Sequence, residues 1–222
     1  MDKNKESQKK KSPISLSYLF YDFVKFTAIP AYLWKLPKRI FESKKAKKWI
    51  KGGALLISNH YSFSDPVLMM LVIWYRRHHF ICIKSLFDGK KGFFFRRFKC
   101  IPIDKENFGM QSFRTITEHL KNDELVSMFP EGHVNRGDGV DAFKSGVILM
   151  SVMSGKPIVP MYMKPRKHFY NRSVVVIGEP IDITAMYGER PSMKEIEEAA
   201  RMLHAKEEEL QKLAYQNKKE RE

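Results

Sequence analysis

Two side chains in the first third of the chain have the types and the spacing of an acid–base pair. His60 and Asp65 lie five positions apart in a polar segment. An aspartate this close in a loop can accept a hydrogen bond from one ring nitrogen of the histidine, which fixes the tautomer and leaves the other nitrogen as a base. Such a pair can deprotonate a hydroxyl, and no enzyme nucleophile is needed if that hydroxyl belongs to the substrate. The plainer alternative is that Asp65 caps a helix and His60 is an ordinary loop residue.

The apolar runs on either side of this segment predict how the pair is positioned. Residues 54–57 form a short run that is typical of a buried strand, and the longer run 67–74 is typical of a helix. Asp65 and Pro66 are typical of a helix start, with Asp at the N-cap and Pro at the first helical position. His60 is therefore predicted in a strand-to-helix loop, where a rigid frame commonly presents catalytic side chains.

A second polar turn follows another strand-like run. The strand predicted at residues 124–129 leads into Pro130-Glu131-Gly132. Because ligands gather at the carboxyl ends of strands in open α/β sheets, we expect Glu131 at the same edge as His60. The alternative is a plain turn with an exposed glutamate. Further strands are predicted at residues 80–83, 101–105, 158–162 and 174–177, and helices at residues 108–121, 147–153 and 193–215.

Four blocks in order carry a resemblance to a known family. They are Asn59-His60 followed by Asp65, Phe129-Pro130-Glu131-Gly132, Phe143-Lys144-Ser145-Gly146 and Ile158-Val159-Pro160. Their order and spacing resemble the glycerolipid acyltransferases of the bacterial 1-acylglycerol-3-phosphate acyltransferase family, over about residues 50 to 180. The resemblance implies an α/β fold with a mixed, mostly parallel sheet flanked by helices. It also implies His60 as the base, oriented by Asp65, and an acyl transfer that needs no metal or other cofactor.

The implied substrates are an acyl thioester and a lysolipid. The resemblance implies that acyl-CoA or acyl carrier protein donates the acyl group to the 2-hydroxyl of 1-acylglycerol-3-phosphate, giving phosphatidic acid in phospholipid synthesis. It assigns Glu131 to the glycerol hydroxyl of this lysophosphatidic acid and Gly132 to a close backbone approach. Lys144, near a predicted helix N-terminus, would favour an anion.

Two departures from the family pattern bear on the acceptor. Lys105 stands where the family usually has an arginine that holds the phosphate, so the contact would be a point charge without a forked geometry. After Gly132 the family usually continues Thr-Arg-Ser, whereas this chain places Arg136 two positions late. These changes leave glycerol-3-phosphate or another lysolipid open as the acceptor.

Charge predicts an anionic partner. The chain has 222 residues, enough for one domain with a sizeable core, and a formal net charge of +15. A basic nucleic-acid-binding domain is the rival from another class, since interleaved aromatics would fit a single-strand groove. The apolar N-terminal segment has no use in such a domain, and no nucleic-acid motif is found. We therefore expect an anionic membrane surface, and no nucleic acid, as the partner; a lipid-binding protein without catalysis is the third possibility.

The N-terminal region predicts the mode of membrane contact. Residues 1–12 read as a disordered basic tail, 13–50 as a helical membrane-interface segment and 51–222 as the acyltransferase domain. Asp22 and Lys25 interrupt the aromatic-rich stretch, which favours a helix lying in the interface over a spanning one. The alternative is an amphipathic helix packed on the domain's own core. The expected location is the cytoplasmic face of the cell membrane, peripheral or monotopic.

Two further expectations concern metals and the C-terminal helix. With two cysteines and no zinc-type Cys/His cluster in the sequence, we expect no structural metal. The charges of helix 193–215 are expected to form a solvated face, while its apolar residues pack on the domain: Ile196, Ala199, Ala200, Leu203 and Leu210.

Overall fold

A mostly parallel sheet is the centre of the fold. The computed structural model describes residues 18–32, 36–48, 50–90, 92–104, 109–131, 145–165 and 172–216. Within them, seven strands pair in the order β1-β7-β6-β2-β5-β3-β4, and each neighbouring pair is parallel except β6 with β7. The strands are β1 (Lys38–Phe41), β2 (Ala54–Ser58), β3 (His78–Ile83), β4 (Ile101–Ile103), β5 (Leu125–Met128), β6 (Ile158–Met163) and β7 (Val174–Ile177).

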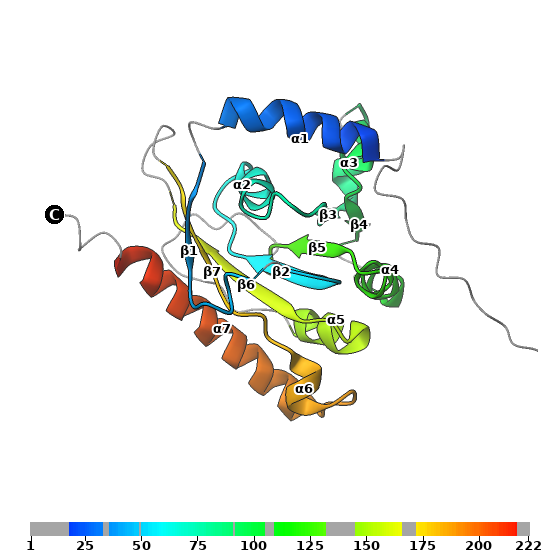
Figure 1. Ribbon diagram of the computed structural model, residues 1–222. Helices are drawn as coiled ribbons and strands as arrows, with labels where there is room; N and C mark the ends of the chain where they lie inside the picture. Colours follow the sequence, from blue (N-terminus) through cyan, green and yellow to red (C-terminus); the bar gives the residue numbers. More distant parts are fainter. Residues whose placement is uncertain are drawn as a thin grey trace, which may run out of the picture.

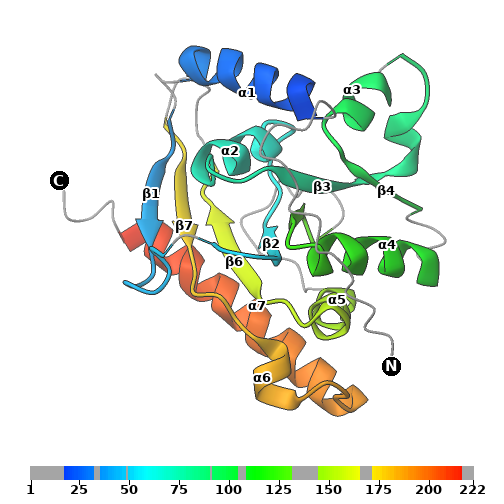
Figure 2. The ribbon, with the colours of Figure 1, turned by 45° about the vertical axis from the view of Figure 1, so that its right-hand side comes forward.

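Helices lie on both faces of this sheet, as Figures 1 and 2 show from two directions. One side carries α4 (Met110–Lys121), α5 (Gly146–Ser154), α6 (Ile183–Tyr187) and α7 (Met193–Gln216). The other carries α1 (Leu19–Tyr32), α2 (Asp65–Val72), the 3₁₀ helix η3 (Lys84–Phe87) and α3 (Gly92–Arg97). The expected mixed, mostly parallel sheet flanked by helices is thus confirmed.

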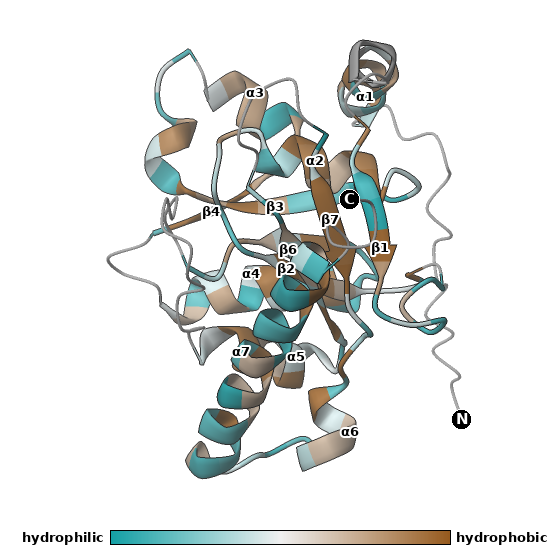
Figure 3. Ribbon diagram, turned by 90° about the vertical axis from the view of Figure 1, so that its left-hand side faces the viewer, coloured by the Kyte–Doolittle hydropathy of each residue, from teal (hydrophilic) through white to brown (hydrophobic). Residues whose placement is uncertain are grey.

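Two apolar layers hold the helices against the sheet. Leu55 and Ile57 of β2 join the cluster under α4, α5 and α7, whereas Ala54 and Leu56 join the cluster under α2. This alternation follows from the two-residue period of a strand. All five residues of β2 are buried, because helices cover both faces of a parallel sheet and such strands read as continuous apolar runs. In Figure 3 strand β7 is likewise coloured as hydrophobic.

Strand β1 was not expected from the sequence. Its residues belong to the basic stretch that we assigned to the membrane-interface segment 13–50, yet they pair in parallel with β7, from Lys38 with Val174 to Phe41 with Ile177. A four-residue strand at the edge of a sheet needs little apolar sequence, and the lysines and arginines around it conceal the pattern. Part of the segment 13–50 therefore contributes to the same sheet as the rest of the domain.

Pro160 lies inside the sheet and not at its edge. It stands in β6 opposite Ile57 of β2, and its carbonyl accepts from Gly178 N at 2.9 Å on the other side. Ile158 bridges Ile181, and Met161 pairs with Ile177. The segment that runs from Ile177 to Ile181 is therefore one residue longer than the stretch of β6 that it pairs with. This bulge in the partner segment explains how proline is tolerated. In the sequence, a proline inside the strand predicted at residues 158–162 indicates either a bulge or a strand at the sheet edge; the structure shows the bulge, and the edge is wrong.

Helix α7 begins with a reciprocal cap. Ser192 Oγ accepts from Glu195 N at 3.3 Å, and Glu195 Oε2 accepts from Ser192 N at 2.6 Å. This capping box satisfies two N–H groups that a helix start would otherwise leave without partners. Among all the helices described, none has the length and apolar composition needed to cross a bilayer.

Candidate active site

His60 and Asp65 meet in the loop that follows β2. His60 Nδ1 and Asp65 Oδ2 are 3.0 Å apart, and the Asp65 side chain is nearly buried. A carboxylate accepts only, so Nδ1 carries the proton and Nε2 presents a lone pair. The His60 side chain is 16% exposed, and no hydrogen-bond partner for Nε2 occurs among the described residues. The pairing expected from the sequence is therefore present, with the geometry of an oriented base.

The same carboxylate oxygen also organises the loop backbone. Asp65 Oδ2 accepts from Tyr61 N and from Ser62 N, each at 2.7 Å. Asp65 N in turn donates to Ser62 O at 2.9 Å. The His60 ring and two loop N–H groups thus all bind one oxygen of Asp65. Asp65 therefore both orients His60 and holds the loop that carries it.

Helix α2 starts one residue earlier than we expected, and Asp65 is not its cap. Ser64 occupies the N-cap position without a side-chain bond to the helix, and Asp65 is the first helical residue. The Asp65 side chain turns back to the preceding loop instead of to the N–H groups of its own helix. The capping role predicted for Asp65 was therefore wrong, because the loop N–H groups and the imidazole compete for the same oxygens.

The ring of Phe129 fixes the plane of the His60 imidazole. The two ring centroids are 4.0 Å apart and the rings are nearly parallel, at 15°. Phe129 directly follows β5, which is the parallel neighbour of β2. The stack therefore ties the carboxyl ends of two adjacent strands together at the edge where we expected ligands to bind.

Asn59 anchors the start of the loop to the third strand at this edge. Its side-chain amide donates to Met163 O at 2.9 Å and accepts from Met163 N at 2.7 Å. These two hydrogen bonds resemble those between neighbouring strands, and they satisfy the backbone N–H and C=O of Met163 at the end of β6. Asn59 is fully buried, so losing either bond would leave buried polar groups without partners at a cost of about 1–3 kcal/mol each.

Glu131 comes to the same edge of the sheet, two residues after Phe129. It follows β5 and is 5% exposed, so the alternative of an exposed glutamate in a plain turn is wrong. The other predicted binding residues, Lys105, Gly132, Arg136 and Lys144, lie outside the described residues. The structure therefore brings His60, Asp65 and Glu131 to one edge, and the four remaining residues stay predictions.

Comparison with known proteins places this site in a family. The sequence profile of the family described as Acyltransferase matches residues 36–164, which is more than half of the chain. The chain belongs to the acyltransferase family. The matched stretch contains His60, Asp65 and Glu131, and the fold around them is that of an acyltransferase enzyme.

Individual relatives agree with this assignment. The 1-acyl-sn-glycerol-3-phosphate acyltransferase of Bacillus subtilis (strain 168) is 29% identical over 136 residues, covering 59% of this acyltransferase and 67% of the relative. A Caenorhabditis elegans protein provisionally given the same name is 31% identical over 144 residues, covering 59% of this chain and 50% of that protein. The match spans two thirds of the first and half of the second.

A solved structure shares the fold. The crystal structure of the 1-acyl-sn-glycerophosphate acyltransferase PlsC from Thermotoga maritima superposes with a TM-score of 0.63 and 18% sequence identity. The match covers 87% of this chain and 79% of that one. At this level of identity the likeness supports the architecture of the acyltransferase and leaves substrate recognition to other arguments.

Glu207 is a residue near the site that sequence analysis missed. It lies on α7 and is 1% exposed. Burial raises the pKa of Glu207 to about 9, and the nearby Glu131 carboxylate adds to the rise, while the Asn59 backbone N–H opposes it. In this acyltransferase Glu207 is therefore a neutral carboxylic acid at pH 7, next to the turn that carries His60.

The spacing of α7 contained the signal. The buried residues of α7 follow one another at three- and four-residue steps, as on one face of a helix, and one of them is Glu207. Glu207 lies four residues after Leu203 and three before Leu210, both of which we expected to be buried. The expectation that all charges of this helix are solvated was wrong for Glu207. That expectation followed from the charged residue type, whereas the position of Glu207 among the buried apolar residues of α7 indicates the inward face.

Two tyrosines connect the loop that carries His60 to β6. The hydroxyls of Tyr61 and Tyr162 are 3.4 Å apart, and Tyr162 is fully buried in β6. Burial raises the pKa of Tyr61 and that of Tyr162, so both phenols are neutral at physiological pH. The contact between Tyr61 and Tyr162 thus links the loop that carries His60 to β6 through two neutral phenols.

Proposed function

We propose that this acyltransferase transfers a fatty acyl group to the 2-hydroxyl of 1-acylglycerol-3-phosphate and so makes phosphatidic acid. The donor is a thioester, acyl-CoA or acyl carrier protein. The observation that carries the proposal is the His60–Asp65 pair, with Nδ1 held at 3.0 Å and Nε2 presented at the carboxyl edge of the sheet. The relatives from Bacillus subtilis and Caenorhabditis elegans are both named for transfer to 1-acyl-sn-glycerol-3-phosphate, which supports this choice of acceptor.

The geometry supports direct transfer without an acyl-enzyme intermediate. His60 Nε2 takes the proton of the acceptor hydroxyl as its oxygen attacks the carbonyl carbon of the thioester. Asp65 accepts the Nδ1–H bond throughout and stabilises the imidazolium that forms. When the carbon–sulfur bond breaks, the imidazolium returns the proton to the leaving thiolate. The base is then regenerated, and the products are the new ester and a free thiol.

The acceptor is held by groups on either side of this pair. Glu131 lies at the same edge of the sheet, and we assign it to the glycerol hydroxyl of the acceptor. Gly132 would allow the backbone to approach, and Lys105, Arg136 and Lys144 would hold the phosphate. This set follows from the order of the motifs in the sequence and from the described positions of β4, β5 and α5, which precede or follow these residues.

Helix α1 supports docking on a lipid surface, because it exposes an apolar stripe. Leu19, Phe23 and Phe26 lie at helical spacing on this stripe and are 58%, 64% and 76% exposed. The side that faces the domain carries the buried ring of Tyr21 and two charged side chains: Asp22 pairs with Arg77 at 2.6 Å, and Lys25 donates to the carbonyls of Trp74 and Arg76. A helix whose charged side chains are bound by the domain while an apolar stripe faces outward is suited to an apolar medium.

Helix α3 extends this apolar surface and borders it with cations. Phe20 contacts Phe93, Phe94 and Phe98 edge-on or at a tilt, so α1 and α3 lie side by side. Phe93 and Phe94 are about half exposed, and Arg96 and Arg97 are exposed beside them. Aromatics in the headgroup layer with arginines on anionic lipid give the expected peripheral contact at the cytoplasmic face of the membrane.

A paired variant assay tests the proposed function. Wild type, His60→Ala and the control His204→Ala are assayed with 1-acylglycerol-3-phosphate, glycerol-3-phosphate and neutral lysolipids, each with acyl-CoA and with acyl carrier protein. We expect transfer to 1-acylglycerol-3-phosphate to fall at least about 100-fold in His60→Ala only. Full activity of His60→Ala would refute the catalytic assignment. Preference of the wild type for another acceptor would refute the substrate.

A further inference from the structure

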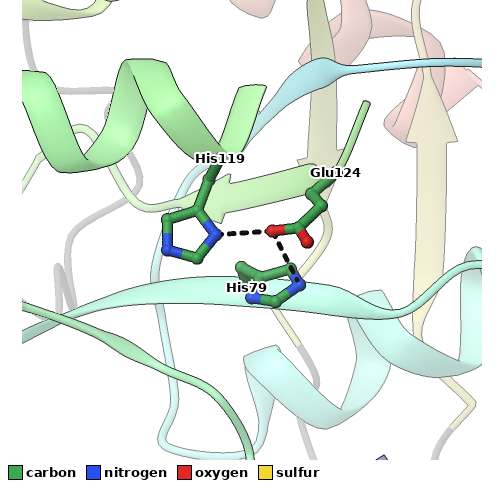
Figure 4. A group of neighbouring side chains, drawn as sticks. All are labelled: His79, His119 and Glu124. Carbon is green, nitrogen blue, oxygen red and sulfur yellow. Dashed lines mark hydrogen bonds and ion pairs between the residues drawn. The ribbon is translucent and has the colours of Figure 1, made fainter. Parts of the chain in front are cut away.

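Three side chains of metal-ligating types, His79, His119 and Glu124, gather in a cluster that Figure 4 shows. His79 comes from β3, His119 from the last turn of α4, and Glu124 from the residue before β5. One ligand atom from each residue lies within 4.8 Å of the other two. His79 Nε2 is 3.5 Å and His119 Nδ1 is 2.5 Å from Glu124 Oε2. Two imidazoles thus converge on a single carboxylate oxygen.

The tautomer of His79 is suited to metal binding. Its Nδ1 lies 3.2 Å from the carbonyl oxygen of Lys99, and a carbonyl can only accept. The proton is therefore on Nδ1, and Nε2, which lies on the Glu124 side, is the nitrogen that can bind a metal ion when it is unprotonated. Metal-bound histidines almost always donate the other ring N–H to a carbonyl or carboxylate in this way. His79 is 3% exposed, so the arrangement is fixed by packing and not by solvent.

The frame around the cluster is rigid on two sides. His79 pairs with Val126 in the parallel ladder of β3 and β5, two residues beyond Glu124. Glu124 N donates to His119 O at 3.1 Å, which closes the turn between α4 and β5. Backbone bonds therefore hold all three ligands, and their side chains need little reorganisation to bind an ion.

We propose that His79, His119 and Glu124 bind one Zn²⁺ ion. Two imidazoles and one carboxylate are a ligand set that zinc accepts, with bonds of about 2.0–2.2 Å and tetrahedral geometry, which separates ligand atoms by about 3.3–3.5 Å. The His79–Glu124 pair already has this separation. His119 is 31% exposed and can retreat by about 1 Å to reach it, while its Nδ1 proton passes to solvent.

Tyr18 lies next to one of the three proposed ligands. Its hydroxyl is 3.4 Å from His79 Nε2, and its ring lies under the guanidinium of Arg77, 4.7 Å away, and under the ammonium of Lys99, 5.4 Å away. Arg77 is neutralised by Asp22. The fourth position falls to the Tyr18 hydroxyl or to water, and binding would then connect the start of α1 to the sheet.

The site is structural and separate from acyl transfer. β3 and β5 are parallel, and His79 and Glu124 lie near their amino ends, whereas His60 and Glu131 follow the carboxyl ends of β2 and β5. Zinc would cross-link β3, α4 and β5 and so stabilise the fold. The expectation of no structural metal rested on the absence of a zinc-type Cys/His cluster, and these three residues are 40 and 5 positions apart in the sequence, which matches no such motif.

Zinc titration tests the proposal. Calorimetric titration of the full chain with ZnCl₂, with reductant present, is expected to show one ion bound per chain and a rise in the thermal midpoint. His119→Gln and Glu124→Gln are expected to weaken binding at least about tenfold, since even outer-shell changes can have effects of this size. His204→Gln is the matched control, because His204 and Glu208 form a histidine–carboxylate pair 3.8 Å apart without a second histidine.

The opposite results are equally clear. Equal zinc binding by wild type and His119→Gln would overturn the assignment, as would absence of binding by the wild type. Cys82→Ser distinguishes a thiol site: Cys82 packs in the core layer under α2, an odd number of positions from His79 and hence on the other face of β3. Loss of zinc in Cys82→Ser with retention in His119→Gln would refute the proposal. Acyl-transfer rates with and without zinc are expected to agree, so the outcome is independent of the proposed function.

Discussion

The imidazole of His60 lies against the ring of Phe129 with the ring centroids 4.0 Å apart and the planes inclined by 15°. Asp65 fixes which nitrogen carries the proton, but a single hydrogen bond leaves the ring free to rotate about it. The stack removes that freedom, because the ring plane is set by a side chain from the neighbouring strand. Phe129 is therefore a positioning residue in the proposed mechanism, and its effect should appear in the rate of the chemical step.

Replacing Phe129 tests this role. Phe129→Ala is expected to lower kcat by about 10- to 100-fold with a smaller change in KM, because a misoriented base affects the transition state more than binding. Phe129→Tyr keeps the stacking surface and is expected to stay within a fewfold of wild type. Equal loss in both variants, or a change confined to KM, would show that the ring does not orient His60.

Asp65→Asn separates the two tasks of the carboxylate. The amide oxygen can still accept from Tyr61 N and Ser62 N, so the loop is expected to keep its shape and the thermal midpoint to change little. The charge that stabilises the imidazolium is lost, so kcat is expected to fall by about 10³- to 10⁴-fold, as in other histidine–aspartate pairs. Asp65→Ala, in contrast, also leaves the two loop N–H groups without their acceptor and is expected to lower the midpoint. An active Asp65→Asn enzyme would refute the assigned role.

The buried acid Glu207 predicts a pH-dependent stability. Its pKa is about 9 in the folded protein against an ordinary value of 4.5, so the folded state binds the proton more tightly. The contribution to stability is complete below pH 4.5 and is lost as the pH rises towards 9, at up to about 1.4 kcal/mol per pH unit. Glu207→Gln cannot ionise and is expected to lack this decline.

Urea unfolding between pH 6 and 9 measures the difference. The free energy of unfolding of Glu207→Gln minus that of the wild type is expected to increase with pH over this range. The exposed neighbour Glu208 provides the control, because Glu208→Gln should follow the wild-type curve. Parallel curves for wild type and Glu207→Gln would show that Glu207 is ionised in the folded protein.

The exposed stripe of α1 predicts the membrane affinity. Phe23→Ser and Phe26→Ser are each expected to weaken binding to phosphatidylglycerol-containing vesicles by about tenfold, since burying one such ring contributes about 1.5–3 kcal/mol. Activity on a short-chain soluble acceptor is expected to be unchanged. Met193→Ser, at an exposed apolar position far along the chain, serves as the control in flotation assays. Unaltered vesicle binding of the double variant would exclude α1 as the contact.

Most of the sheet could be predicted because its strands are apolar and bounded by turns. The bounds predicted for the strand at residues 174–177 match β7, and the strand-like run at residues 54–57 covers all of β2 except its last residue. Strand β1 could not be predicted, since a short edge strand among lysines has no apolar pattern. The His60–Asp65 contact followed from spacing alone. The extra bonds of Asp65 to the loop backbone did not, because they depend on how the turn closes.

Contacts between distant residues account for the rest. The stack of His60 on Phe129 joins residues that are 69 positions apart in the sequence, and the link between Asn59 and Met163 joins residues 104 positions apart. Such pairs depend on strand order, which a single sequence does not reveal. Glu207 is a different case, since the helical spacing of its apolar neighbours already predicted an inward position and only its residue type argued against it.

The exposed apolar stripe of α1 has a consequence for handling the purified protein. In plain buffer the side chains of Leu19, Phe23 and Phe26 have only water or another copy of the chain to contact. Gel filtration without detergent is therefore expected to give larger species as concentration rises, and micelles are expected to return the protein to single chains. A sample that looks aggregated would then consist of folded molecules joined through the surface that we propose binds lipid.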